Sequence, residues 1–487
     1  MLKLSHLDTK MASNIKVNAF YNMLYRALSV LFPLVTAGYA SRVLLADGIG
    51  KVSYAQSIVA YFLMFASMGI PNYGIREIAK NQNKDYVNRT FTEILLINTI
   101  STLFVSIIFY SLIFYTNLFD YELNLYVIIG LMLILNLFNV DWFFQGKEEY
   151  KYIAIRSLVI KVFFTILLFV FVKEKDDYPI YALLYCLATA GNYFFNIYHV
   201  RKYVRLDFTS LNIYKHIKPI LLFFTASISI EIYIHLDTTM LGLMSDESSV
   251  GYYSNTSKLI RVISNSLIAI GAVIFPRVSL YFENGDIISI RRLGNRICSF
   301  LLLLSTLFMT ACFCASKEAI CLLFGSLFIS ASTTLMIQSS LIPIFTIAGG
   351  FATPILLATN QEKKYTLCTF IGLIIHLLLN LLLIPLYEHD GASMASVVSE
   401  FYLTTIQLYF IRNYIKMHIF LVSLRNVLII LLCSILVCNI FDNFWNMNSI
   451  ISLIVKIVII SLIFMMFLII IKDSTLKYIY SKIKLKI

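Results

Sequence analysis

Residues 44–53 read Leu44-Leu45-Ala46-Asp47-Gly48-Ile49-Gly50-Lys51-Val52-Ser53, a short polar turn between two long apolar segments. A second turn reads Leu243-Met244-Ser245-Asp246-Glu247-Ser248-Ser249-Val250-Gly251-Tyr252-Tyr253-Ser254. With one inserted residue, Gly50 aligns with Gly251. The same register places Ser53 on Ser254. We interpret the two turns as equivalent points of an internal repeat.

The composition is that of a membrane protein. Of the 487 residues, 59% are hydrophobic and only 14% are charged, whereas soluble domains are about 45–50% apolar and about 25% charged. A transmembrane helix needs about 20 apolar residues, so most of the chain can be divided into such helices. This excludes a secreted disulfide scaffold, a nucleic-acid-binding domain and an ordinary cytosolic enzyme.

The hydropathy pattern predicts 14 transmembrane helices. We expect them at residues 15–44, 49–79, 88–116, 121–143, 150–172, 178–200, 217–244, 248–276, 293–316, 328–358, 365–386, 391–411, 419–440 and 448–471. The repeated turns are six helices apart, and because six is even both halves have the same orientation. Such a parallel repeat is one of the standard plans of transporters, with the substrate site between the halves.

The fold class predicted from this pattern is an all-α integral membrane protein. Two six-helix lobes related by a parallel pseudo-repeat would be followed by two extra C-terminal helices. The expected boundaries are 1–210 for the N-lobe with helices 1–6 and 211–415 for the C-lobe with helices 7–12. Helices 13–14 and a cytoplasmic tail would occupy 416–487.

The net charge of +12 follows the membrane topology and does not indicate nucleic acid as a partner. In the predicted topology, 28 Lys and Arg residues lie in the termini and in alternate loops, whereas the opposite loops hold five. Cytoplasmic loops carry the excess of Lys and Arg. The asymmetry therefore predicts that both termini are cytoplasmic.

Ionisable side chains inside three of the predicted helices are the candidate functional residues. A charge at mid-bilayer costs roughly 2.5–3.5 kcal/mol on insertion scales, so each requires a partner, a water-filled cavity or a function. The candidates are Arg26 in the first helix, Glu231, His235 and Asp237 in the seventh, and Lys258 and Arg261 in the eighth. The alternative is that these groups only satisfy one another inside the bundle or reach an interface.

Further features of the predicted spans concern function or helix packing. Arg156 and Lys161 of the fifth helix are additional candidates for a functional role, and because they are five residues apart they point to different faces. Gly349-Gly350 is a candidate for close contact between helices. Lys456 lies outside the repeat, and we expect it to serve packing or to face a partner.

Several motifs carry a resemblance to a known family. They are Asn18-Ala-Phe-Tyr-Asn22, Ser41-Arg-Val-Leu44, Asp47-Gly-Ile-Gly-Lys-Val-Ser-Tyr54, Ser67-Met-Gly-Ile-Pro-Asn-Tyr-Gly-Ile-Arg-Glu-Ile-Ala79, Asp237-Thr-Thr-Met-Leu-Gly242 and Val250-Gly-Tyr-Tyr-Ser-Asn255. With them the sequence resembles a polysaccharide flippase (O-antigen or capsule type) of the multidrug/oligosaccharidyl-lipid/polysaccharide exporter superfamily. The motifs lie in helices one, two, seven and eight, and the topology resembles the family over nearly the whole chain.

The resemblance implies a function and a location. A protein of this family in the bacterial cytoplasmic membrane flips an undecaprenyl-diphosphate-linked oligosaccharide to the periplasmic leaflet, for surface polysaccharide biosynthesis. Two lobes surround a central, often cationic cavity and are thought to work by alternating access. Membrane lipids would be partners, as would a polysaccharide polymerase and chain-length machinery. Coupling to an ion gradient is proposed for the family, and the sequence does not identify the ion.

The resemblance also suggests roles for the charged residues. A diphosphate crossing hydrocarbon unaided would meet a prohibitive desolvation cost. Arg26, Lys258 and Arg261 would form a cationic station for it, because the guanidinium fork suits phosphate oxygens. Glu231, His235 and Asp237 would be the ion-coupling candidates.

The alternatives are a peptidoglycan-precursor flippase and a multidrug exporter of the same superfamily. From a different class, a membrane-embedded polysaccharide polymerase or glycosyltransferase would need catalytic groups on a large loop. The longest predicted loops have only about 15–20 residues. The sequence contains no GxxxxGK[ST], HExxH or GxSxG motif, so we expect neither an enzyme nor a bound cofactor or metal.

Overall fold

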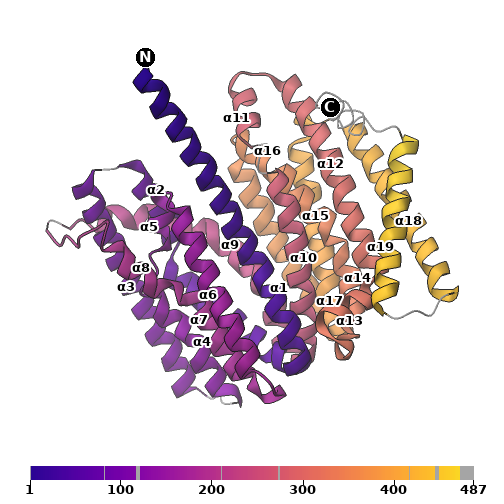
Figure 1. Cartoon of the computed structure of the whole chain (residues 1–487), viewed down its shortest axis with the longest axis horizontal. Helices are drawn as coiled ribbons and strands as arrows, with labels where there is room; N and C mark the ends of the chain where they lie inside the picture. The colour runs from indigo at the N-terminus through magenta and orange to yellow at the C-terminus, as the bar shows by residue number, and fades with distance from the viewer. Residues whose placement is uncertain are drawn as a thin grey trace. The chain divides into compact units, whose positions relative to one another are not determined.

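The described chain consists of helices joined by short turns (Figure 1). The computed structural model describes residues 2–471 except 82, 117–120, 210, 272–274, 416 and 445–448, and gives only the backbone at 2–20, 22, 26–31, 226, 417–420, 423 and 470–471. No strand occurs in these ranges, and the all-α class is confirmed. Contacts divide the chain into two units, Met1–Gly242 and Leu243–Ile487. The predicted lobe boundary at 210/211 remains a prediction.

The first unit contains nine α-helices in the ranges that the structure describes. They are α1 (Leu2–Ser67), α2 (Ile70–Lys80), α3 (Lys84–Tyr115), α4 (Leu123–Asn136), α5 (Asp141–Gly146), α6 (Tyr150–Phe171), α7 (Tyr178–Ala190), α8 (Asn192–Val200) and α9 (Tyr214–Met244), whose last two residues belong to the second unit. The predicted helix 121–143 is interrupted between α4 and α5, and the predicted helix 178–200 is divided at Gly191 into α7 and α8.

A buried aromatic cluster packs α2, α3 and α5 of the first unit together. Trp142 and Phe143 of α5 pack with Phe91 of α3 and are at most 2% exposed. Gly74 of α2 allows this contact, since a Cβ at that position would lie 2.5 Å from the Trp142 ring. The absence of a side chain at Gly74 therefore lets α2 lie directly on the indole.

The second unit holds the remaining helices of the described chain. They are α10 (Glu247–Gly271), α11 (Phe275–Glu283), α12 (Ile287–Cys314), α13 (Ser316–Phe324), α14 (Ala331–Ser339), α15 (Leu341–Ile347), α16 (Thr353–Ala358), α17 (Glu362–Phe410), α18 (Met417–Phe444) and α19 (Ser449–Ile471). A π-helical turn, Ala348–Ala352, joins α15 to α16 inside the predicted helix 328–358.

The π-helical turn lies in close backbone contact with the end of α10. A Cβ added at Gly271 would lie only 1.9 Å from the carbonyl oxygen of Gly350. Only a residue without a side chain fits at this contact between two backbones. The predicted close contact at Gly349-Gly350 is confirmed, and its partner is the last residue of α10.

The long helix α17 folds back on itself at Glu388, where φ is 48°. On the two sides of this break, a Cβ at Gly372 would lie 3.7 Å from Leu403 Cβ, and His376 Nε2 lies 3.5 Å from Ser396 Oγ. A straight helix would hold Gly372 and Leu403 about 47 Å apart at about 1.5 Å per residue. The segment is therefore an antiparallel hairpin of two helices, at the place where the sequence predicts a turn between residues 386 and 391.

Ten helices of the described chain are long and apolar enough to span a membrane, or eleven if the bent α9 counts as one span. Two of them, Phe32–Lys80 and Glu362–Phe410, have 49 residues each. At about 1.5 Å per residue, that is about 74 Å, more than twice the hydrocarbon thickness of about 30 Å. The first is broken at Leu45, where φ is 62°. The count of 14 spans remains a prediction.

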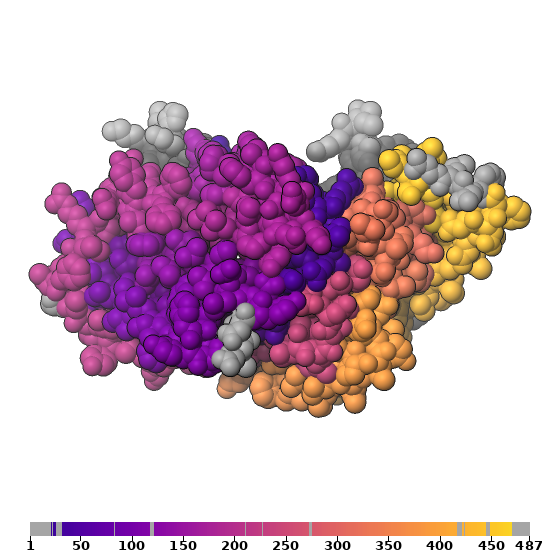
Figure 2. Space-filling model, turned by 90° about the horizontal axis from the view of Figure 1, so that it is seen from below, coloured from indigo at the N-terminus to yellow at the C-terminus, as the bar shows by residue number. Residues whose placement is uncertain are grey.

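The last two helices pack at one edge of the second unit. In Figure 1, α18 and α19 lie beside α12, and Figure 2 shows their surface in yellow. Buried Leu303 of α12, Ile430 of α18 and Phe464 of α19 form the apolar contact. Lys456 adds a polar one, because its Nζ lies 2.6 Å from Glu318 Oε1 of α13. The expectation that Lys456 serves packing is confirmed.

Candidate functional site

Two predicted site residues, Glu231 and His235, contact each other on α9. The Glu231 Oε2 atom lies 3.9 Å from His235 Nε2, and both side chains are partly exposed. The His235 ring packs edge-on against Tyr61 of α1, with the ring centres 6.2 Å apart. One turn further along α9, Thr239 Oγ1 lies 3.1 Å from the Tyr61 hydroxyl. Helices α1 and α9 thus hold this acid–imidazole pair within the first unit.

Asp237, the third predicted ion-coupling residue, is buried. It is 4% exposed, whereas the side chain of Glu231 is 44% exposed. Six residues separate the two carboxylates, so they lie on faces of α9 about 120° apart. One carboxylate is therefore accessible and the other is enclosed, which gives α9 two acids with different access to water and ions.

The predicted cationic residues Lys258 and Arg261 lie on α10 of the second unit. Both are partly exposed. Lys258 Nζ donates to Asn255 Oδ1 at 3.4 Å, one turn earlier on the helix. Because Lys258 and Arg261 are three residues apart, both point to the same side of α10. This side can offer an ammonium and a guanidinium to an anion.

Arg26 lies on α1, but its side chain is outside the described residues. The structure brings Glu231 and His235 into contact and places Lys258 and Arg261 on one helix. The three acid or imidazole groups belong to the first unit and the two described cations to the second. That all six line one cavity remains a prediction.

A buried carboxylate for which the sequence analysis assigned no role is Glu93 of α3. Its side chain is fully buried. Glu93 Oε2 lies 2.6 Å from Lys215 Nζ and 2.8 Å from His216 Nε2, both at the start of α9. Arg89 Nε donates to Glu93 Oε1 at 3.1 Å. Lys215 and His216 are more than 100 residues from Glu93 in sequence, so no local pattern predicts their contact with it. The contacts of Glu93 with Lys215 and His216 join α3 to the N-terminal end of α9.

Arg156 on α6 contacts three polar side chains of the first unit. Its guanidinium lies 3.1 Å from Asp141 Oδ1 and donates to Asn192 Oδ1 at 3.1 Å and to Asn196 Oδ1. This is the arrangement expected of a buried Arg that ties three helices together. The contacts assign Arg156 a structural role.

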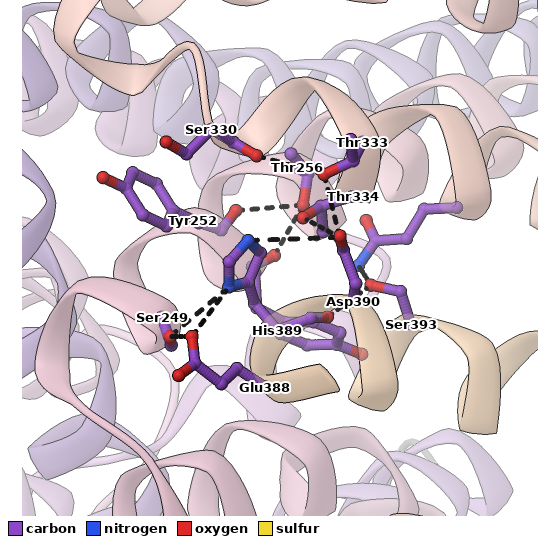
Figure 3. A network of polar contacts seen from close by, with 12 residues as sticks. Ser249, Tyr252, Thr256, Ser330, Thr333, Thr334, Glu388, His389, Asp390 and Ser393 are labelled. Carbon is purple, nitrogen blue, oxygen red and sulfur yellow. Dashed lines mark hydrogen bonds and ion pairs between the residues drawn. The ribbon is translucent and has the colours of Figure 1, made fainter. Parts of the chain in front are cut away.

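A polar network surrounds the fold-back point of α17 (Figure 3). His389 lies between two carboxylates, with Nδ1 4.0 Å from Glu388 Oε2 and Nε2 4.0 Å from Asp390 Oδ1. Thr334 of α14 donates to Asp390 Oδ1 at 2.8 Å, and Ser249 at the start of α10 lies 3.3 Å from His389 Nδ1. The network connects α10, α14 and α17. The sequence analysis assigned these residues no role, and the charged string Glu388-His389-Asp390 between two apolar segments is the signal that could have indicated the network.

Among the described residues, no group of three or more His, Cys, Asp or Glu side chains is arranged to hold a metal ion. Within that part of the chain, the polar chemistry consists of buried ion pairs, hydroxyl networks and the partly exposed charges of α9 and α10.

Comparison with solved structures places this fold among membrane transporters. The chain is similar to "Lipid II flippase MurJ, inward closed conformation", with a TM-score of 0.73 and 13% identity over 93% of this chain and 99% of that chain. It is also similar to an inward-facing multidrug resistance MATE family transporter of the MOP superfamily, with a TM-score of 0.65 and 10% identity over 82% and 98% of the two chains. The fold class is that of these transporters.

The chain belongs to the family described as "Polysaccharide biosynthesis protein", whose profile matches residues 15–282. It is 24% identical over 415 residues to the "Putative O-antigen transporter" of Escherichia coli (strain K12), covering 82% of this chain and 97% of that protein. A protein of the same name from Shigella dysenteriae is 23% identical over 270 residues, 54% of this chain and 67% of its own length. The predicted resemblance is confirmed, and the chain is a multi-pass bacterial membrane protein.

Proposed function

We propose that this chain is a flippase that moves undecaprenyl-diphosphate-linked oligosaccharide repeat units across the cytoplasmic membrane by alternating access, for surface polysaccharide biosynthesis. The observation that carries the proposal is the family match, together with a similarity that spans 97% of the Escherichia coli relative named as an O-antigen transporter. The fold, which is similar to that of a lipid II flippase over 93% of this chain, supports a transporter of lipid-linked molecules.

Lys258 and Arg261 of α10 are the proposed station for the diphosphate, with Arg26 of α1 as a third cation. Both α10 side chains are partly exposed and lie on one side of the helix. An Arg can hold two phosphate oxygens at once, and a Lys provides a compact point charge. Together these groups would replace the water that the diphosphate gives up when it leaves the cytoplasm.

Glu231, His235 and Asp237 are the proposed ion-coupling groups. Glu231 and His235 are 3.9 Å apart and partly exposed, so a proton or cation arriving there changes the charge of the pair. Each elementary charge moved across 100 mV contributes about 2.3 kcal/mol. One or two such charges are enough to bias the two access states.

We also propose a membrane topology and a set of partners for the protein. Both termini lie in the cytoplasm, as the 28-to-5 distribution of cations predicts. Helices 1–6 and 7–12 act as two lobes of a parallel repeat. The partners are membrane lipids, the lipid-linked oligosaccharide, a polysaccharide polymerase and chain-length machinery.

The test is transport in proteoliposomes loaded with undecaprenyl-diphosphate-linked oligosaccharide under an imposed proton gradient. Wild type is compared with Arg261→Ala and Lys258→Met, and with Lys363→Met, an exposed cation outside the proposed site. We expect wild type and Lys363→Met to flip the lipid, and the two site variants to lose transport while keeping the wild-type melting temperature.

The same assay separates the alternatives. A wild-type protein that prefers a lipid-linked peptidoglycan precursor over the oligosaccharide lipid would be a peptidoglycan-precursor flippase. Export of organic cations with no movement of either lipid would make it a multidrug exporter. Either result overturns the proposed substrate, and the second also removes the role given to the α10 cations.

A further inference from the structure

The first unit contains a cavity of about 70 Å³ between α1, α6 and α7. Its lining includes Lys161 and Thr165 of α6, Thr36 of α1 and Thr189 of α7, among apolar and tyrosine side chains. None of the described lining residues is acidic. All of its described lining residues belong to the first unit, and none of them belongs to α9.

Lys161 is a cation without a partner in this cavity. Among the described residues, it has no hydrogen bond or ion pair, in contrast to Arg156 on the same helix, which lies 3.1 Å from Asp141. It is the twelfth of the 22 residues of α6. Lysines near the ends of a transmembrane helix can extend their ammonium to the membrane interface. Lys161 lies in the middle of α6, so its ammonium stays in the low-dielectric region of the bilayer. An ammonium there needs an acceptor, because it has three donors and no lone pair.

Thr165 is a second group of the cavity without a partner. Its buried hydroxyl oxygen has no hydrogen bond, whereas the hydroxyls of Thr36 and Thr189 donate to carbonyls four residues earlier at 3.1 and 2.9 Å. Leaving such a group unsatisfied is unfavourable. Thr165 follows Lys161 by four residues, so both face the same side of α6. The Lys161 ammonium and the Thr165 hydroxyl, two donors without acceptors, thus line the same cavity.

We propose that Lys161 and Thr165 form a binding site for a small inorganic anion of halide size. Water alone would satisfy the hydroxyl but would leave the charge uncompensated. An anion next to the ammonium compensates its charge, and this attraction is stronger in a low-dielectric surrounding than in water. At about 70 Å³ the cavity is smaller than an apolar cavity of about 150 Å³ that binds benzene, which favours a ligand much smaller than a sugar.

The test is halide binding by the purified full-length chain in detergent. Thermal unfolding is followed as chloride replaces gluconate at constant ionic strength, and binding of isotopic chloride is measured directly. We expect a saturable rise in melting temperature in wild type. Lys161→Met should abolish saturable binding or weaken it roughly tenfold or more, as expected for the loss of a charge-assisted hydrogen bond. Thr165→Val should weaken it less.

The control is Lys151→Met, an exposed lysine at the start of the same helix, which should bind chloride like wild type. Lys161→Met is expected to fold, because removing an unpaired, partly buried charge relieves its desolvation cost, and Thr165→Val provides an independent variant. The proposal is overturned if wild type shows no saturable chloride effect beyond gluconate. It is also overturned if Lys161→Met binds chloride unchanged, or if wild type responds at this site to pH and not to halide.

Discussion

The Nζ atom of Lys456 lies 2.6 Å from Oε1 of Glu318, which joins α19 to α13 across 138 residues of sequence. The same ammonium lies 2.9 Å from Asp442 of α18. The helices that lie outside the predicted repeat are therefore attached to the second unit by a buried cation with two carboxylates as well as by apolar contacts.

Glu318→Gln should destabilise the second unit. Burial would raise the pKa of the Glu318 carboxyl, but the hydrogen bond from Lys456 outweighs it and lowers the pKa below the ordinary value of 4.5. A lowered pKa means that the pair stabilises the fold above about pH 4.5 and that this contribution is lost as the pH falls through the folded-state value. We expect Glu318→Gln to cost about 1–3 kcal/mol at neutral pH and to reduce the loss of stability on acidification.

The measurement is the melting temperature in detergent between neutral and acidic pH. Glu362→Gln, the same substitution at an exposed position, is the control and should follow wild type. Equal acid sensitivity of Glu318→Gln and wild type would show that another group controls this transition.

The fold-back of α17 predicts a specific disulfide. In a background without the native cysteines, Gly372→Cys and Leu403→Cys should cross-link readily, because their Cβ atoms would be 3.7 Å apart, within the range for a disulfide. The pair Gly372→Cys and Phe401→Cys, in which Phe401 is exposed, serves as the control and should remain reduced. Mobility shift after proteolysis between the helices reports the bond. A cross-link confined to the control pair would contradict the hairpin and the two spans it contains.

Gly271→Ala should be strongly destabilising. The new methyl group would meet the Gly350 carbonyl oxygen at 1.9 Å, and overpacking of this kind typically costs about 1–3 kcal/mol. Gly294→Ala is the matched control, because its Cβ would lie in ordinary contact, 3.5 Å from Phe351. Thermal unfolding of both variants measures the difference. Similar melting temperatures for the two would mean that α10 and the π-helical turn separate at little cost.

Glu231→Gln tests the ion-coupling proposal. If the Glu231–His235 pair carries a charge through the cycle, its loss removes about 2.3 kcal/mol of driving force per 100 mV. We expect net transport driven by a proton gradient to fall sharply, while exchange of lipid without a gradient continues. Glu283→Gln, at an exposed position, should keep both activities. Full gradient-driven transport by Glu231→Gln would assign coupling to other groups.

The sequence alone determined the class and the lineage of the protein. Apolar segments of about 20 residues cannot be placed in water, so their number and spacing indicate a polytopic helical protein whatever its packing. The turns at residues 44–53 and 243–254 and the motifs around them were sufficient for the family resemblance, because both are local patterns. The break of α17 was also visible, since residues 387–390 interrupt two apolar segments.

Only the tertiary structure decided which charges are paired. Arg156 and Lys161 look alike in sequence, yet the first lies 3.1 Å from Asp141 and the second lines a cavity without an acceptor among the described residues. Glu93 meets His216 from 123 residues away. Such contacts depend on how helices far apart in the chain pack together, and helical periodicity fixes the face of a side chain but not the helix that lies opposite it.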